Sequence, residues 1–590
     1  MSDKEENDRV PLLRQKPVRL NYTKRYDQVS WHSADTDFEP EPSASSADER
    51  KKKIKKPVYS KRRKQKIAAL VAVVVIFLSV MCGLIYVYLK QSDEFVEITC
   101  GKVSGDKEVV TNDDGIEKTF YIYKGIPFAE PPVKNNRWKR PVELSTKCWK
   151  DALKAKTFKS PCIGGFGKLI YGSEDCLYLD VYTPRAPLDE ELNPVIVLFN
   201  TEISSVNEES NQHLPSSEFI SEMETVLVNV NFRRDLLGFL STETLSNTTS
   251  HYGNNGIADQ IMSLQWVQNE IKKFGGNPND VTIFSQTSGY ALLSSPKAKG
   301  LFHKMFVFGA SPNFEATYQD AFLQNNGIFK QCKASNSSDL MSCLNKISAT
   351  EIQNSLYANH SNLRWELPDG LNQKDILITV EPNLVPFPPS SLGKTNQIFN
   401  IPVLIGNTAQ ETGLMSKTHP TSLKDLHKVV SASLGQINST LTDYILEHLY
   451  NNKTLKSMNT DVLYQTIVSD IRVLCPTIKL KKEMSKSRKH IFYQYVLSGG
   501  NNGVVHGQDI QSIFTMGNSD PLYNVGRRLR TNLKHFIKYG HPNEFQWESS
   551  KIGLFDTNGD FETLSESYHA QQCEFFNRPE NKLTKYSWRN

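Results

Sequence analysis

An uncharged, apolar run of 23 residues at positions 67–89 constrains this chain more than any other feature of its sequence. About 20 helical residues cross a hydrocarbon core of roughly 30 Å, so the run predicts a transmembrane helix. A cleaved signal peptide would lie at the N-terminus and would have a shorter apolar region. Residues 50–66 hold eleven Lys and Arg and no acid, whereas Asp93 and Glu94 follow the run. This asymmetry predicts a cytoplasmic N-terminus and a C-terminus outside the cell, the single-pass type II topology.

The apolar run divides the chain into a cytoplasmic tail at 1–66, a transmembrane helix at 67–89 and an extracellular domain at 90–590. Up to position 49 the tail is rich in Pro, Ser and acidic residues, a composition typical of disorder. Its basic end is expected to contact anionic membrane lipids. Residues 1–66 carry 18 Lys and Arg against 11 Asp and Glu, which leaves about −2 of the total +5 charge for the remainder. Nucleic acid is therefore not an expected partner of the large domain.

Cysteines and glycosylation sequons agree with this topology. Cys82 lies inside the apolar run, and the other eight of nine cysteines follow it, an even number that suits an oxidising compartment. These eight are Cys100, Cys148, Cys162, Cys176, Cys332, Cys343, Cys475 and Cys573. N-x-S/T sequons on the same side predict glycosylation at Asn247, Asn336, Asn359, Asn438 and Asn452. In the tail, Leu12 and Leu13 end the segment DRVPLL, which resembles an acidic-dileucine sorting motif.

Short β-rich runs alternate with helical patterns after position 90. Strands are predicted at 194–199, 225–232 and 281–284, and an amphipathic helix is predicted at 259–274 with glycines after it as a stop. This alternation indicates an α/β fold with a mostly parallel central sheet flanked by helices. The strand at 281–284 is followed by a tight turn and a helix, the geometry of a nucleophile elbow.

Many motifs from about residue 96 to 583 resemble the cholinesterase and carboxylesterase family in order and spacing. They are YKGIPFAEPP at 123–132, RWKRP at 137–141, EDCLYLDVYTP at 174–184, NFRRDLLGFLST at 231–242, GNNGIADQIMSLQWVQNEIKKFGGNPNDVTIF at 253–284 and QCEFFN at 572–577. The resemblance implies an α/β-hydrolase fold. It also implies disulfides Cys162–Cys176, Cys332–Cys343 and Cys475–Cys573, and leaves Cys100 and Cys148 as a fourth pair that is not typical of the family.

The catalytic triad that the resemblance implies is incomplete. The family's elbow, G-x-S-x-G, reads SQTSG here, so Thr287 stands at the nucleophile position. Glu411 and His506 match the family's acid and base. Threonine is a poor replacement, because its extra methyl group crowds a strained turn and its χ1 angle is stiff. We expect Glu411 and His506 to persist as a buried hydrogen-bonded pair that holds two loops together.

Two further features argue against ester hydrolysis. The family's glycine-rich oxyanion loop is replaced by NTEI, from Asn200 to Ile203, and the loss of one oxyanion donor costs about 2.7–4 kcal/mol. The loop between Cys162 and Cys176 lacks the tryptophan that cholinesterases place over choline, although Phe166 and Tyr171 offer aromatic rings. The sequence therefore predicts a pseudoenzyme with no cofactor and no metal site.

The resemblance then implies a role in cell adhesion. Inactive cholinesterase-like domains occur in a non-catalytic branch that includes neurotactin, gliotactin and the neuroligins, and the predicted orientation is that of neurotactin. We expect a plasma-membrane glycoprotein that binds an extracellular or cell-surface protein. One alternative is a weak carboxylic-ester hydrolase that uses Thr287 with His506 and Glu411, and a second is a sorting or sequestration receptor. A homodimer through a C-terminal helix is disfavoured by Pro579, although small residues around Gly83 offer a helix contact in the membrane.

Overall fold

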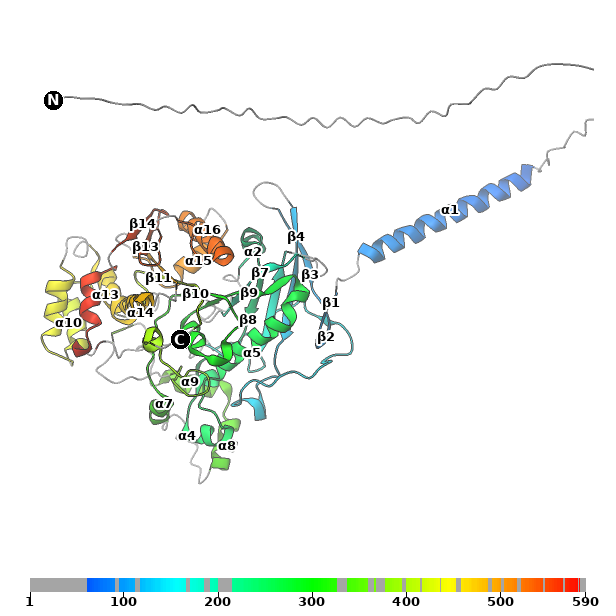
Figure 1. Ribbon diagram of the computed structural model, residues 1–590. Coiled ribbons are helices and arrows are strands. Elements are labelled where there is room, and N and C mark those ends of the chain that lie inside the picture. The colour runs from blue at the N-terminus through cyan, green and yellow to red at the C-terminus, as the bar shows by residue number, and fades with distance from the viewer. Residues whose placement is uncertain are drawn as a thin grey trace, which may run out of the picture. The chain divides into compact units, whose positions relative to one another are not determined.

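The computed structural model divides into two units, Met1–Lys90 and Gln91–Asn590, and each is described by itself (Figure 1). The residues that the structure describes are 61–90, 95–111, 117–165, 170–184, 191–199, 215–325, 337–358, 366–367, 377–394, 399–413, 416, 418–435, 437–451, 458–486, 491–499, 503–516, 521–544, 547–565, 568–581 and 583. The predicted disordered tail, with Leu12 and Leu13, falls outside these residues apart from its last six positions.

The first unit contains helix α1 (Lys61–Lys90), which includes the whole apolar run 67–89. The helix that the sequence predicts is therefore present, and its large side chains between Leu70 and Met81 are exposed. Cys82 is a free, exposed cysteine on it. Within the described part of the chain, no helix has both the length and the apolar character that crossing a bilayer requires. The membrane-spanning role of residues 67–89 therefore stays a prediction.

The second unit is built on a large mixed sheet with the strand order β14-β13-β12-β11-β10-β9-β7-β8-β6-β4-β3. A small second sheet has the order β1-β2-β5. The strands are β1 (Phe95–Ile98), β2 (Gly101–Ser104), β3 (Asp106–Thr111), β4 (Glu117–Pro127), β5 (Leu153–Lys154), β6 (Tyr178–Thr183), β7 (Asn193–Leu198), β8 (Val226–Val230), β9 (Gly276–Ser285), β10 (Lys304–Phe308), β11 (Val403–Thr408), β12 (Phe492–Ser498), β13 (Ile552–Asp556) and β14 (Phe561–Leu564).

The centre of the large sheet, from β8 to β13, is parallel, and the strands toward both edges are antiparallel. Parallel strands are covered on both faces and so read as continuous apolar runs. Accordingly, every residue of β8, β10 and β11 is buried. Successive residues of β7 contribute to two different core clusters, Val195 and Val197 to one and Ile196 and Leu198 to the other. The sheet therefore has a hydrophobic core on each face.

Helices cover both faces of this sheet, in agreement with the predicted α/β architecture (Figure 1). The α-helices of the second unit are α2 (Ser217–Met223), α3 (Asp235–Phe239), α4 (Glu243–Thr249), α5 (Asn255–Glu270), α6 (Thr287–Ser294), α7 (Tyr318–Asn325), α8 (Ser337–Lys346), α9 (Ala349–Ala358), α10 (Leu423–Leu434), α11 (Leu441–Tyr444), α13 (Thr460–Ser469), α14 (Cys475–Lys486), α15 (Gln508–Phe514), α16 (Tyr523–Tyr539) and α17 (Ala570–Phe576). Shorter helical turns are η1 (Lys134–Asn136), η4 (Ile271–Phe274), η5 (Pro296–Ala298), η6 (Pro389–Lys394), η7 (Ile445–Leu449), η8 (Asp470–Leu474) and η9 (Pro579–Asn581).

The helix predicted at 259–274 is present as α5 followed by η4, and it begins four residues earlier than the apolar periodicity indicates. The early start is explained by its first turn, where Asn255 and Ile257 are buried although the pattern there is not amphipathic. Gly275 ends η4 with φ +78°, the left-handed conformation that glycine adopts without steric cost. The chain then enters β9 directly. The predicted strands at 194–199, 225–232 and 281–284 correspond to β7, β8 and the end of β9.

Disulfides join Cys162 to Cys176 and Cys475 to Cys573, two of the pairings that the resemblance implies, and Cys100 to Cys148, the fourth pair that is not typical of the family. Cys343 is also disulfide-bonded, and its expected partner Cys332 lies outside the described residues. Helix α17 ends at Phe576, and Pro579 begins the separate turn η9, so this proline lies outside the C-terminal helix. Of the sequons, Asn247 and Asn438 are exposed, while Asn336, Asn359 and Asn452 are outside the described residues.

Candidate functional site

The three positions that match the family's triad lie beyond the carboxyl ends of neighbouring parallel strands. Thr287 follows β9, Glu411 follows β11 and His506 follows β12. In the sheet these strands follow the order β9-β10-β11-β12 (Figure 1). Crevices at this edge of a parallel sheet are where ligands bind in open α/β folds. The topology therefore brings together residues that are separated by more than two hundred positions in the sequence.

Thr287 has lost the strained geometry of a nucleophile elbow. In active α/β-hydrolases the nucleophile sits on a sharp, strained turn between strand and helix. Here Thr287 is already the first residue of α6, and the described residues with positive φ do not include it. Its neighbour Gln286 has φ −92° and ψ −140°. A β-branched side chain strongly disfavours positive φ, so threonine suits a position without positive φ, and the irregular backbone of the turn lies one residue earlier, at Gln286.

The Thr287 hydroxyl is buried and unused. Its residue is 1% exposed, and Oγ1 has no hydrogen-bond partner among the described residues. A serine-type nucleophile is activated by a histidine that takes its proton, which requires a hydrogen bond between the two side chains. No such bond joins Thr287 to His506 in the described structure. The neighbouring Ser288 is also engaged, since its hydroxyl lies 2.8 Å from Ser285 Oγ and accepts from Gln260 Nε2 at 3.1 Å.

Glu411 and His506 form the expected buried pair. His506 Nδ1 donates to Glu411 Oε2 at 2.6 Å, and both side chains are almost completely buried. The other oxygen, Oε1, accepts from the Thr408 backbone amide at 2.6 Å. A Cβ added to Gly309, at φ +55°, would lie 2.4 Å from His506 Cε1. Glycine after β10 is therefore needed for the imidazole ring to pack at this depth.

The second imidazole nitrogen of His506 faces Gln286. Gln286 Nε2 lies 3.4 Å from His506 Nε2, and with the Nδ1 proton directed at Glu411 the amide donates and the ring nitrogen accepts. In a working triad this is the nitrogen that would accept the nucleophile's proton. The SQTSG motif alone points to its threonine and gives no signal for the role of Gln286. The geometry makes Gln286 the residue that contacts the base.

Asp509 is a second carboxyl group that sequence reasoning did not identify. It is buried on α15, and Tyr495 donates to its Oδ2 at 2.8 Å. Burial raises the pKa of Asp509 to about 6, and repulsion by the nearby Glu411 adds to this increase. Its place three residues after His506, in the motif GVVHGQD, was a signal that it belongs to the same cluster.

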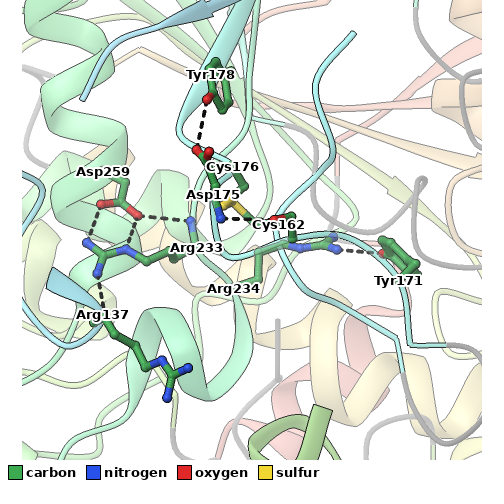
Figure 2. The surroundings of a disulfide bond; sticks show 10 residues. Arg137, Cys162, Tyr171, Asp175, Cys176, Tyr178, Arg233, Arg234 and Asp259 are labelled. Carbon is green, nitrogen blue, oxygen red and sulfur yellow. Dashed lines mark hydrogen bonds and ion pairs between the residues drawn. A yellow bond between two sulfur atoms is a disulfide. The ribbon is translucent and has the colours of Figure 1, made fainter. Parts of the chain in front are cut away.

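Two consecutive arginines lie beside the loop closed by Cys162–Cys176, and one of them, Arg234, contacts it (Figure 2). Arg233 forms a two-pronged ion pair with the buried Asp259, at 2.7 and 2.8 Å. Arg234 donates to the Tyr171 hydroxyl at 2.6 Å, and its guanidinium carbon lies 5.6 Å from the centre of that ring. The aromatic ring that the sequence offered for a quaternary ammonium group therefore already contacts a cation of the protein itself.

Several predicted site residues cannot be placed against this geometry. The loop from Asn200 to Ile203, which replaces the oxyanion glycines, and Phe166 lie outside the described residues. Within the described residues, no group of three or more His, Cys, Asp and Glu side chains is arranged to hold a metal ion. The described contacts join His506, Glu411 and Gln286 into one buried cluster, and Asp509 interacts electrostatically with Glu411 and His506.

Comparison with known proteins places these features in context. A model described as "Carboxylesterase family" matches residues 92–576. The chain is 26% identical over 477 residues to the cAMP-regulated D2 protein of Dictyostelium discoideum. The aligned region covers 76% of this chain and 84% of that protein. It is 24% identical over 521 residues to Cholinesterase of Mus musculus, with 78% and 83% covered. Neurotactin of Drosophila melanogaster is 28% identical over 465 residues, 75% of this chain but only 51% of that protein.

Proposed function

This chain belongs to the carboxylesterase family, whose α/β-hydrolase fold its sheet and helices share, and on that premise we propose that it is a non-catalytic, cell-surface binding protein that acts in adhesion. The observation that carries the proposal is the state of the triad positions. The Thr287 hydroxyl has no partner among the described residues, and Gln286 contacts the nitrogen of His506 that would accept a proton. Without a hydrogen bond to His506, the Thr287 hydroxyl is a weak nucleophile at neutral pH.

The remaining parts of the site support the same proposal. Thr287 is buried at the start of a helix and is not among the described residues with positive φ, so a carbonyl substrate would not meet a projecting hydroxyl. Arg234 already contacts the ring of Tyr171, which removes one surface for a choline-like cation. What remains is a disulfide-bonded domain with exposed sequons at Asn247 and Asn438. Such a domain suits recognition of an extracellular protein better than turnover of a small ester.

The proposal includes the location. Residues 67–89 would anchor the chain in the plasma membrane as a single-pass type II protein, with the basic residues 50–66 on the cytoplasmic side against anionic lipids. The family domain, with its disulfides and sequons, would then face the outside of the cell. The resemblance to neurotactin adds support through the non-catalytic branch discussed above. The partner would be a protein on a neighbouring cell or a secreted protein.

Hydrolysis is tested first, with purified full-length wild type, Thr287→Ala and Thr287→Ser. Thiocholine and nitrophenyl esters are the substrates. We expect all three proteins to be as inactive as the buffer, including Thr287→Ser, because the relaxed elbow and Gln286 remain. Turnover by wild type that disappears in Thr287→Ala would overturn the pseudoenzyme part of the proposal.

Adhesion is tested with cells that display the full chain. We expect these cells to form mixed aggregates with a subset of cell lines that lack the protein, because a heterophilic partner is on the other surface. Cells that express the cytoplasmic tail and residues 67–89 without the family domain are the control. Correctly displayed protein that aggregates with no cell type and binds no secreted protein in a broad screen would contradict the adhesive role.

One second candidate is favoured by a specific observation, the intact His506–Glu411 hydrogen bond at 2.6 Å. This pair would suit slow hydrolysis of activated esters if the Thr287 side chain reached His506. Incubation with an organophosphate, followed by mass spectrometry of the peptide that contains Thr287, separates the two functions. A phosphonylated Thr287 supports the hydrolase, and an unmodified peptide supports the binding protein.

A further inference from the structure

Two histidines lie together at the C-terminal end of α16 (Tyr523–Tyr539), a helix that carries none of the triad positions and is labelled in Figure 1. His535 lies on the last turns of the helix, and His541 follows its end. The centroids of the two imidazole rings are 4.7 Å apart, and the rings are inclined by 63°. Gly540, at φ +80°, ends the helix and donates its amide to the Phe536 carbonyl at 2.7 Å. This left-handed turn brings His541 back beside His535.

Backbone carbonyls fix the protonation pattern of both rings. His535 Nδ1 lies 2.9 Å from the His541 carbonyl oxygen, and His541 Nδ1 lies 3.0 Å from the Pro542 carbonyl oxygen. A carbonyl oxygen only accepts, so each Nδ1 carries the proton. In the neutral rings each Nε2 then presents a lone pair, and neither Nε2 has a hydrogen-bond partner among the described residues. Metal-binding histidines are oriented in this way, by an N–H donated to a carbonyl or carboxylate.

The spacing of the rings suits a shared ion. With a metal–nitrogen distance of 2.0–2.1 Å, an imidazole centroid lies about 3.2 Å from the metal. Two such rings at 90° to 110° around one ion therefore have centroids about 4.5–5.2 Å apart. The observed 4.7 Å falls within this interval. Simple packing of two aromatic rings accounts for the spacing as well, but it does not require both Nδ1–H groups to be held by carbonyls.

We propose that His535 and His541 form a surface site for one transition-metal dication, and that Cu²⁺ binds there more tightly than Ni²⁺ or Zn²⁺. Imidazole nitrogen suits Cu²⁺, Ni²⁺ and Zn²⁺, and affinity in this series is highest for Cu²⁺. No third His, Cys, Asp or Glu completes a metal-binding group among the described residues, so water fills the other coordination positions. The site is independent of the proposed adhesion and of the residues at the former triad.

The charge around the site sets a second expectation. Lys538 lies on the same part of the helix, with its ammonium group 5.3 Å from the centre of the Tyr539 ring, and that ring is 4.5 Å from His535. A nearby positive charge repels a dication. Replacing Lys538 by glutamine therefore strengthens metal binding while leaving both ligands in place.

The test is titration of the untagged, chelator-treated full chain with CuCl₂, followed by calorimetry and electron paramagnetic resonance. We expect one site whose spectrum shows nitrogen ligands and whose affinity for Cu²⁺ exceeds that for Zn²⁺. His535→Asn and His541→Asn each lower the affinity at least tenfold, and Lys538→Gln raises it. His448→Asn, which removes another exposed histidine, leaves the site unchanged.

The unfolding midpoint of each variant without metal controls for damage to the fold. Equal Cu²⁺ affinity and spectra in wild type, His535→Asn and His541→Asn overturn the proposal. Loss of the site in His448→Asn, or absence of nitrogen signals in the wild-type spectrum, overturns it as well. A further variant, Gly540→Ala, strains the turn without removing a ligand, and we expect it to weaken binding at unchanged histidine content.

Discussion

Gln286 shows how much of the site's chemistry depends on single side chains. Its amide occupies the contact with His506 Nε2 that a nucleophilic hydroxyl would need. The sequence predicted the loss of serine at Thr287 and the buried pair of His506 with Glu411. It did not predict the role of Gln286, because a residue between two motif positions has no pattern of its own. Which atoms meet across loops from separate strands is decided by packing, and neither spacing nor composition records that.

The first prediction concerns the buried pair. His506→Ala leaves the Glu411 carboxylate in the interior with the Thr408 amide as its remaining hydrogen-bond donor among the described residues, so we expect the free energy of unfolding to fall by about 1–3 kcal/mol. Urea unfolding at pH 7 measures this loss. Glu411→Gln keeps an oxygen acceptor for His506 and is the matched control with a smaller loss. Equal stability of His506→Ala and wild type would show that the pair does not hold the loops.

Asp509 carries the second prediction, on pH. Its pKa is raised by burial to about 6 in the folded chain, above the value of 3.8 that it has when exposed. The folded state therefore binds this proton more tightly than the unfolded state. The contribution of Asp509 to stability is full below pH 4 and is lost as the pH rises through 6. Asp509→Asn removes this group. As the pH rises from 4 to 6, the wild type should therefore lose stability relative to the variant. A difference that stays constant over this interval contradicts the prediction.

At the scale of elements, strand ends and disulfides position the site. The parallel strands β9, β11 and β12 bring three distant motifs to one edge of the sheet, and the alternation of apolar runs with a helical pattern predicted such a sheet. The exact helix starts were not predictable. Helix α5 begins at Asn255 because its first turn is buried by tertiary contacts, which a periodicity of polar and apolar residues does not register. The start of α6 at Thr287 is likewise a consequence of how β9 ends.

The third prediction compares two disulfides by the length of chain that each closes. Cys475–Cys573 spans 98 positions and links α14 to α17, whereas Cys100–Cys148 spans 48. In the chain-entropy description, a doubling of the loop adds about 0.6 kcal/mol to the stabilisation. We expect the double serine variant at Cys475 and Cys573 to lose about 2–5 kcal/mol, and slightly more than the variant at Cys100 and Cys148. Denaturant titration of both variants checks the order, and the reverse order would contradict it.

At the scale of the whole molecule, the predicted membrane topology rests on sequence features that the fold of the second unit does not contain. The apolar run, the basic residues before it and the position of the cysteines and sequons predicted an orientation, and the disulfides of the family domain suit the predicted outside location. The identity of a binding partner has no comparable signal, because recognition depends on surface shape that a single sequence does not specify.

The fourth prediction tests that orientation. If residues 90–590 face outside, Asn247 and Asn438 are reached by the glycosylation machinery, since both are exposed. Treatment with a glycosidase should lower the mass of the full chain, and the double variant Asn247→Gln and Asn438→Gln should shift less. External protease applied to intact cells should cleave the family domain and leave an epitope in the tail intact. Loss of the tail epitope under the same conditions would reverse the assigned topology.

The absence of positive φ at Thr287 has an evolutionary consequence. Active sites retain strained backbone because catalysis selects for it, and that strain lowers the stability of the fold. A family member without a strained elbow avoids this cost, so its free energy of unfolding lies further above the minimum that a protein needs to stay folded. Most substitutions are destabilising, so a wider margin lets more of them persist. If the chain is non-catalytic as proposed, a wider margin would let this scaffold vary its surface more freely, which is the property that diversification of recognition requires.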